Sequence, residues 1–199
     1  MQQRPTYNLE LIKSVLDKDY IELHLEKLVV DEDSDETRSH VHLEMSDNNG
    51  AKVTVDGDGV GLVDATFNAL LERYGVEYQS IKSIEVVAFN VEARLDTKTD
   101  KVGVDSMGCV TLGVNNSEGK LFEFTDESRS ISRSSARAVM AAVEYFVNAE
   151  RAFITLHRAR QDAKERRRDD LIVRYTRELA EVVKSTSYAA VIENMKEDL

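Results

Sequence analysis

One stretch of the sequence, Lys52–Tyr74, constrains the fold more than any other, because it combines a strand, a glycine-rich corner and a helix in immediate succession. Val53 and Val55 alternate with polar residues, as in a half-buried strand. Residues 57–61 (GDGVG) form the corner, and apolar residues at helical spacing then predict a helix up to Tyr74. We expect the glycines to allow a tight reversal of the backbone and the close approach of another chain or a ligand.

The pattern of this stretch occurs a second time, 69 residues further along the chain. Gly50 and Gly119 hold the same place in two predicted hairpin turns, SDNNG and NNSEG, and the two helix starts are separated by the same offset. Each copy consists of three predicted strands and a helix. Since such a unit cannot close a core alone, we expect the two copies to pack together. The sequence therefore predicts an α+β fold with two pseudosymmetric strand–strand–strand–helix units and a helical C-terminal extension.

Apolar spacing predicts the other elements. The expected helices and strands are a helix at Thr6–Leu16, strands at Tyr20–Val30, Ser39–Met45, Ala51–Val55, Ile81–Leu95, Cys109–Val114 and Lys120–Phe124, a long helix opened by a serine-rich corner at Ser128–Ser135, and helices at Leu171–Val183 and Tyr188–Met195. Polar loops are expected at Asp31–Thr37 and at 96–101. The predicted organisation is an N-terminal helical segment (1–19), a two-repeat domain (20–149, divided into 20–78 and 79–149) and a helical extension (150–199).

Composition excludes several classes of partner. A net charge of -11 argues against nucleic acid and against anionic membrane surfaces, which would repel the chain. No apolar run approaches the roughly 20 residues that span a bilayer, and the N-terminus has no signal-peptide core. One cysteine, Cys109, suits a reducing compartment and is expected to be a buried strand residue. We therefore expect a cytoplasmic protein.

Three partial motifs for ligands and metals fall short of a site. The acidic loop at Asp31–Thr37 has calcium-like D-x-D-x-D spacing, but Glu36 stands where such a loop needs glycine. His40 and His42 share a strand face but lack a third ligand at clear spacing. The corner at 57–61 is not a dinucleotide-binding G-x-G-x-x-G motif. The sequence thus predicts no metal site, no cofactor and no catalytic residue.

The corner and the helix after it resemble the C-terminal regulatory (allosteric, dimerisation) domain of 2-isopropylmalate synthases, which citramalate synthases share. The match to the family's G-D-G-P-V-D-A corner comprises Gly57-Asp58-Gly59, Gly61 and Val63-Asp64-Ala65, with Leu62 in place of the proline. A second, more degenerate match is Ser128-Arg129-Ser130-Ile131, followed by an alanine-rich helix. The resemblance covers about 20–149 and implies that the predicted repeat is the family's pseudo-twofold unit.

The resemblance implies a role in branched-chain amino-acid biosynthesis. In the family this domain follows a catalytic barrel and binds leucine or isoleucine between the domains of a dimer. A barrel needs on the order of 200–250 residues of strand–helix repeats, and none are seen in this sequence. The leading hypothesis is a non-catalytic regulatory and dimerisation module, acting as a homodimer. The alternatives are the regulatory part of a split 2-isopropylmalate synthase, an acyltransferase whose barrel is a separate chain, and a pure assembly protein acting through residues 150–199.

If an effector binds, we expect its charged groups at the glycine corner. Free amides at the helix start can bind an anion, and a carboxylate can bind a cation. The aliphatic part would then contact side chains that the two repeats bring together. The expected effector residues are Gly57, Asp58, Gly59, Gly61, Asp64, Ile84, Val86 and Ile131. The alternative is that the glycines serve only the strand-to-helix turn.

Overall fold

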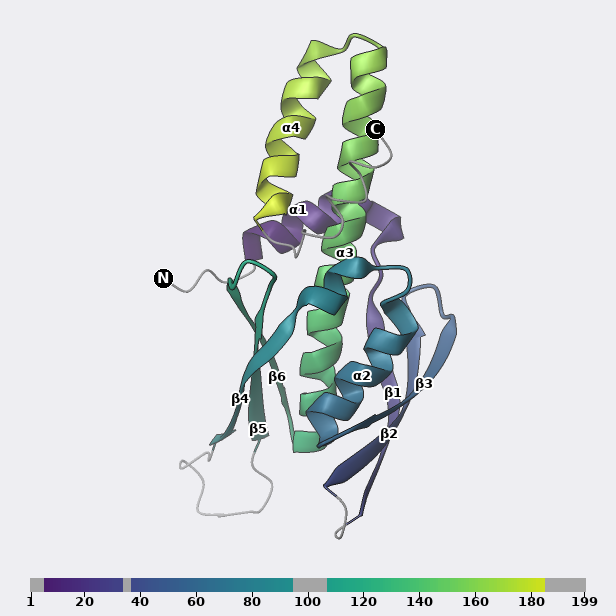
Figure 1. The fold of residues 1–199 in the computed structure, drawn as a ribbon, viewed down its shortest axis with the longest axis vertical. Helices are drawn as coiled ribbons and strands as arrows, with labels where there is room; N and C mark the ends of the chain where they lie inside the picture. Colours follow the sequence, from purple (N-terminus) through teal and green to yellow (C-terminus); the bar gives the residue numbers. More distant parts are fainter. Residues whose placement is uncertain (1–5, 34–36, 95–106, 185–199) are drawn as a thin grey trace.

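The computed structural model describes residues 6–33, 37–94 and 107–184 of the chain, which form two similar units joined by a shared core (Figure 1). The first unit consists of β1 (Leu23–Asp33), β2 (Arg38–Asp47), β3 (Lys52–Gly59) and α2 (Leu62–Tyr74). The second consists of β4 (Glu85–Arg94), β5 (Met107–Asn115), β6 (Leu121–Ser128) and α3 (Ile131–Glu165). The elements outside these units are α1 (Thr6–Leu16), the short 3₁₀ helices Asp17–Asp19 and Gln79–Ser83, and α4 (Asp169–Val183). The predicted loop at 96–101 and the predicted helix at Tyr188–Met195 lie outside the described residues.

The predicted α+β fold is confirmed. Each unit is an antiparallel three-stranded sheet, with the strand orders β1-β2-β3 and β4-β5-β6. Figure 1 shows α2 and the first half of α3 lying between the two sheets. In β2, Val41, Leu43 and Met45 are buried while the residues between them are more exposed, so each sheet has one face toward the helices.

The internal repeat extends to individual hydrogen bonds in the two hairpin turns. In the first turn, the Asp47 side chain accepts hydrogen bonds from the backbone amides of Asn49 and Ala51. In the second, Asn116, which lies 69 positions later, accepts from the amides of Glu118 and Lys120 in the same way. Gly50 and Gly119 have φ values of 78° and 74°, a left-handed conformation that favours glycine. The predicted equivalence of the two turns is therefore confirmed.

Strand register confirms the offset and locates an insertion. Leu43 pairs with Val55 in the first sheet, and Leu112 pairs with Phe124, 69 positions later, in the second. Both first strands contain a bulge, at Leu25/Lys27 and at Val86/Ala88, but these bulges are only 61 positions apart. The connection between the first two strands is consequently longer in the second unit.

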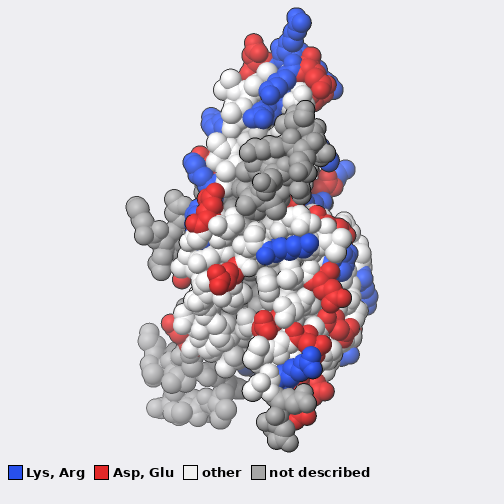
Figure 2. All heavy atoms as spheres, in the orientation of Figure 1, with Lys and Arg blue, Asp and Glu red and all other residues white. Residues whose placement is uncertain are grey.

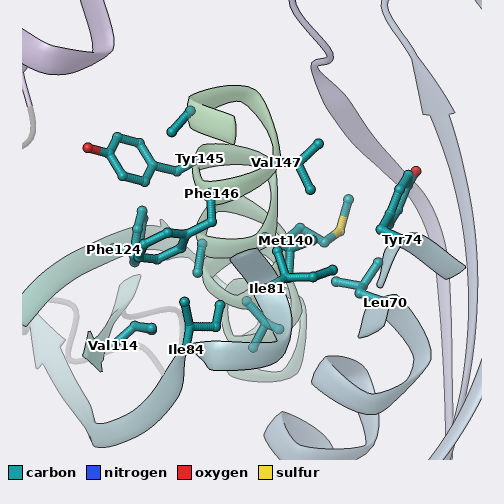
Figure 3. Packing of buried hydrophobic residues seen from close by; sticks show 14 of the residues in the cluster. Leu70, Tyr74, Ile81, Ile84, Val114, Phe124, Met140, Tyr145, Phe146 and Val147 are labelled. Atoms are coloured by element: carbon teal, nitrogen blue, oxygen red, sulfur yellow. The ribbon is translucent and has the colours of Figure 1, made fainter. Parts of the chain in front are cut away.

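The core is centred on α3, which contacts both sheets as well as α1, α2 and α4. Phe146 is fully buried, and its ring lies 5.3 Å from that of Phe122 in an edge-to-face arrangement. Figure 3 shows the labelled side chains gathered around α3, with Leu70 and Tyr74 of α2 on one side and Phe124 of β6 on the other. Each unit thus closes the apolar surface of the other.

Polar side chains in the middle of α3 hold the segment that leads into β1. Asn148, fully buried, accepts a hydrogen bond from the Ile21 amide at 2.9 Å and donates to the Ile21 carbonyl at 2.7 Å. Glu144 accepts from the Leu23 amide and from the Tyr20 hydroxyl. Burial raises the pKa of Glu144, while these two hydrogen bonds lower it. Because the backbone amide and carbonyl of Ile21 are paired with the Asn148 side chain, the segment before β1 does not need a strand partner.

The observed first strand differs from the predicted one at both ends. β1 begins at Leu23 rather than at Tyr20, since the preceding residues bond to α3 instead. It also continues into the acidic stretch predicted as a loop, where Asp33 pairs with Arg38 of β2. In the second unit, the start of the predicted strand at Ile81 is wrong as well, because Gln79–Ser83 forms a 3₁₀ helix.

Beyond the two units, α3 continues without interruption to Glu165 and pairs with α4 in a helical hairpin that projects from the body (Figure 1). The boundary expected at 149–150 therefore falls inside one helix. α1 contacts both α3 and α4 at the base of this hairpin. Within the described ranges, no helix is long and apolar enough to cross a membrane.

Candidate functional site

A cavity of about 660 Å³ lies where the two units meet, between the starts of α2 and α3 and the start of β4. Its volume is within the range of roughly 300–1,000 Å³ that is usual for small-molecule sites. The residues that line it are Gly61, Leu62, Val63, Asp64, Phe67, Asn68, Ile84, Glu85, Val86, Phe89, Ile131, Ser132 and Ser135. Most of these side chains are apolar. Two of the polar ones, Asp64 and Ser132, belong to the first turns of the two helices.

The repeat explains why both helices begin at this cavity. Leu62 and Ile131 are the first residues of α2 and α3 and lie 69 positions apart. β4 forms the remaining wall. Val86 and Phe89 pair in register with Val114 and Leu112, so they lie on the face of the sheet that is directed toward the helices. Phe89 nevertheless remains 42% exposed, because it faces the cavity rather than a packed helix.

The two helix starts differ in how their first amides are satisfied. At α3, the Ser130 hydroxyl accepts a hydrogen bond from the Arg133 amide. At α2, the residue before the helix is Gly61, and among the described residues no side chain caps this position. The Asp64 carboxylate instead accepts from the amide of Val60, outside the helix. The first-turn amides of α2, which have no intrahelical acceptors, and the partial positive charge of the helix start are thus available at the cavity.

The role expected for the glycines of the corner is corrected by the structure. Gly57 and Gly59 are strand residues of β3, and neither has a positive φ. A Cβ atom on Gly57 would lie 2.6 Å from the Cβ of Ala69, and one on Gly59 would lie 2.7 Å from a carboxylate oxygen of Asp64. These two glycines are therefore required because α2 packs directly on the backbone of β3, and the close approach is made by the chain's own helix.

The expected effector residues separate into two groups. The structure brings Gly61, Asp64, Ile84, Val86 and Ile131 together in the lining of the cavity. Gly57, Asp58 and Gly59 are outside that lining. The predicted set lacked eight other lining residues: Leu62, Val63, Phe67, Asn68, Glu85, Phe89, Ser132 and Ser135. The 69-residue offset could have found Leu62, which corresponds to Ile131, but the placement of Phe89 depends on the β4 bulge.

A second hollow, of about 770 Å³, lies beside β3 and α2 and includes Gly57 and Asp58. It is larger than the cavity, but several of its charged or titratable side chains are engaged with one another or with neighbours. Asp58 lies 3.2 Å from a ring nitrogen of His40, and Arg73 pairs with Glu77. We therefore consider the apolar cavity the better candidate for a small-molecule site.

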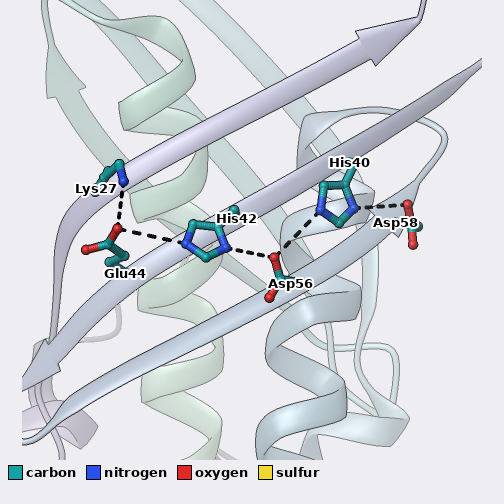
Figure 4. Close-up of polar contacts among 6 residues, drawn as sticks. All are labelled: Lys27, His40, His42, Glu44, Asp56 and Asp58. Carbon is teal, nitrogen blue, oxygen red and sulfur yellow. Dashed lines mark hydrogen bonds and ion pairs between the residues drawn. The ribbon is translucent and has the colours of Figure 1, made fainter.

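His40 and His42 lie on the outer face of the first sheet, within a chain of charged side chains (Figure 4). A ring nitrogen of His42 lies 2.7 Å from Asp56, and Glu44 pairs with Lys27 at 2.8 Å. The hydrogen bond from Lys27 lowers the pKa of Glu44. Within residues 6–33, 37–94 and 107–184, no group of three or more His, Cys, Asp or Glu side chains is arranged to hold a metal ion.

The architecture defines a two-repeat α+β domain, and comparison with known proteins identifies its family. Residues 8–147 match the LeuA allosteric (dimerisation) domain, and the chain belongs to this family. The match confirms the resemblance drawn from the glycine corner and supports a regulatory and dimerisation role in the 2-isopropylmalate synthase family. It ends within α3, so most of the helical hairpin lies beyond it. A comparison with curated proteins found no matching sequence.

The packing of β3 on α2 leads to a matched pair of substitutions. Gly59→Ala should lower the free energy of unfolding by roughly 1–3 kcal/mol, because the added methyl group forces α2 away from the strand. Gly61→Ser should change it by only a few tenths of a kcal/mol, since a Cβ there meets nothing within 4 Å among the described residues and serine is a favourable N-cap. Urea denaturation of both variants measures the difference. Equal stabilities would contradict the packing role of Gly59.

Proposed function

We propose that this chain is a non-catalytic regulatory module that acts as a homodimer and binds a small branched-chain amino acid, leucine or isoleucine, in the cavity. The observation that supports this most directly is the composition of the cavity wall. An uncapped helix start and a carboxylate lie at one side, and a set of apolar side chains lies at the other. An amino acid with a branched aliphatic side chain combines the three complementary groups.

Each part of such a ligand has a matching part of the wall. The carboxylate of the ligand accepts hydrogen bonds from the amides of Gly61, the residue before α2, and Leu62, its first residue, where the helix dipole also favours an anion. The ammonium group pairs with Asp64, which already accepts one hydrogen bond, from Val60. The aliphatic side chain contacts Val86 and Phe89 and is removed from water.

Exposed apolar residues in the wall of the cavity and next to it support the homodimer. Phe89, Val91 and Ile131 are 42%, 43% and 51% exposed. Val91 pairs with Val110, whose side chain is buried, so Val91 belongs to the same face of the sheet as Phe89. Contiguous exposed apolar side chains are typical of association surfaces. In a twofold-symmetric dimer, each copy would cover these residues of the other.

Ligand binding is tested by thermal unfolding with leucine and two matched analogues. Leucine at 100 times its dissociation constant should stabilise the protein by roughly 2.7 kcal/mol, which corresponds to several degrees. Leucinamide lacks the carboxylate and 4-methylpentanoate lacks the ammonium group, so neither should produce this shift at the same concentration. The proposal fails if neither leucine nor isoleucine at millimolar concentration stabilises the protein.

A substitution at Gly61 separates helix capping from ligand binding. Gly61→Ser places a hydroxyl where the ligand carboxylate is expected, so leucine binding should weaken while the stability of the free protein is kept or slightly raised. Asp58→Asn, outside the cavity, is the matched control and should bind leucine as the natural protein does. Calorimetric titration of both variants measures the effect, and unchanged binding by Gly61→Ser would rule out this placement of the carboxylate.

The dimer is tested by light scattering at micromolar concentration. The natural chain should have twice its 22.5 kDa mass. Val91→Lys should shift the mass toward that of one chain, because it places an ammonium group in the apolar contact. Val173→Lys is the control, because Val173 is equally apolar but lies on α4, away from the cavity. A monomeric natural chain, or the same effect from both variants, would contradict the proposed surface.

A further inference from the structure

One sheet edge differs from the other three. β1, β3, β4 and β6 each pair with a neighbouring strand on one side only. Such edges attract further strands unless helices or charges protect them. α2 packs on β3, where Asn68 donates a hydrogen bond to the Asp58 carbonyl, and α3 packs on β6. β1 carries Lys27 and three acidic residues at 31–33. Among the described residues, β4 packs extensively only against β5, so no helix protects its outer edge.

The sequence of β4 also lacks protective residues along most of its length. Residues 86–91 (VVAFNV) contain neither a charge nor a proline, and most of them are β-branched or aromatic. Val87 is 45% exposed, in addition to Phe89 and Val91. Figure 2 shows mostly uncharged atoms over β4, whereas charged side chains gather over the hairpin and the first unit. An apolar edge strand of this kind is a surface on which another strand can pair.

A second copy of this chain is the partner that fits this edge. The family match describes a dimerisation domain over residues 8–147, which includes β4 and leaves out most of the hairpin. The apolar surface also continues beside β4. A Cβ atom on Gly108, which pairs with Ala93, would lie 3.1 Å from Cγ1 of Ile131. The exposed Ile131 side chain therefore lies next to β4, and a folded partner can cover it while it pairs with the edge.

We propose that β4 pairs antiparallel with β4 of a second copy, about a twofold axis at Val91, so that the β4-β5-β6 sheets of the two copies join into one continuous sheet. This inference rests on the homodimer proposed above and specifies its contact. The strand itself places the axis. Beyond the bulge at Val86/Ala88, the register with β5 is continuous from Ala88 to Arg94, and Val91 is the centre of that stretch. A twofold axis perpendicular to the sheet makes such a pairing self-complementary.

This register matches the side chains on both faces of the joined sheet. On the face directed toward the helices, Val91 meets Val91 of the partner subunit. Phe89 meets Ala93 of the partner subunit, so a large side chain lies opposite a small one. On the outer face, Asn90 meets Glu92 of the partner subunit, so no like charges lie directly opposite each other. The backbone groups along the free edge of β4 gain hydrogen-bond partners at the same time.

Cysteines at two exposed positions of the outer face test the register. Every variant also carries Cys109→Ala, because Cys109 pairs with Glu92 in the adjacent strand and would compete for a cysteine there. When the Asn90→Cys and Glu92→Cys variants are refolded together and oxidised, a disulfide should link two chains, since Cα atoms directly opposite lie about 4.5–5.5 Å apart. Either variant alone should not close, because its two cysteines are offset by two residues and roughly 8 Å apart.

Light scattering of the natural chain separates this inference from the proposed homodimer. We expect a dimeric mass together with cross-linking of the mixed variants only. A dimeric mass without that cross-link, or with equal cross-linking of the single variants, would overturn the pairing of the β4 edges and leave the homodimer in place. A monomeric natural chain would overturn both.

Discussion

Each three-stranded sheet in this domain has one apolar face and only one helix of its own, and that shortage of covering surface determines the architecture. The two units bury their faces against each other, with α2 and the first half of α3 between the sheets. α3 contacts elements of both units, and its Asn148 side chain also binds the segment that leads into β1. A unit separated from its counterpart would expose a large apolar surface to water.

The same packing creates the candidate site. Because the units are related by a repeat, the starts of α2 and α3 meet at one end of the shared core, where β4 is left partly uncovered. The cavity is thus a consequence of placing two helices between two sheets. Its polar groups include the side chains of Asp64 and Ser132, and no capping side chain is present at Gly61 among the described residues. At the opposite end of α3, the helical hairpin formed with α4 projects from the two units, and most of it lies beyond the family match.

The sequence was informative where local chemistry decides the conformation. Gly50 and Gly119 identified both hairpin turns, because a left-handed backbone in a tight turn favours glycine. The function of Gly57 and Gly59 was misjudged, since the need for glycine there arises from a helix that packs on the strand only in the folded state. Likewise, no periodicity could place Phe89 in the cavity, because its orientation depends on a bulge in β4. Tertiary contacts, rather than propensities, decided these cases.

The central claim, that two half-closed units form one cooperative core around α3, is tested most directly by native-state hydrogen exchange at the two central strands. The amides of Leu43 in β2 and Leu112 in β5 occupy equivalent positions in the two sheets. The account predicts that both exchange only through global unfolding, with the same free energy as urea denaturation measures. Exchange of one sheet at a clearly lower free energy, while the other remains protected, would show that the units fold independently and would contradict it.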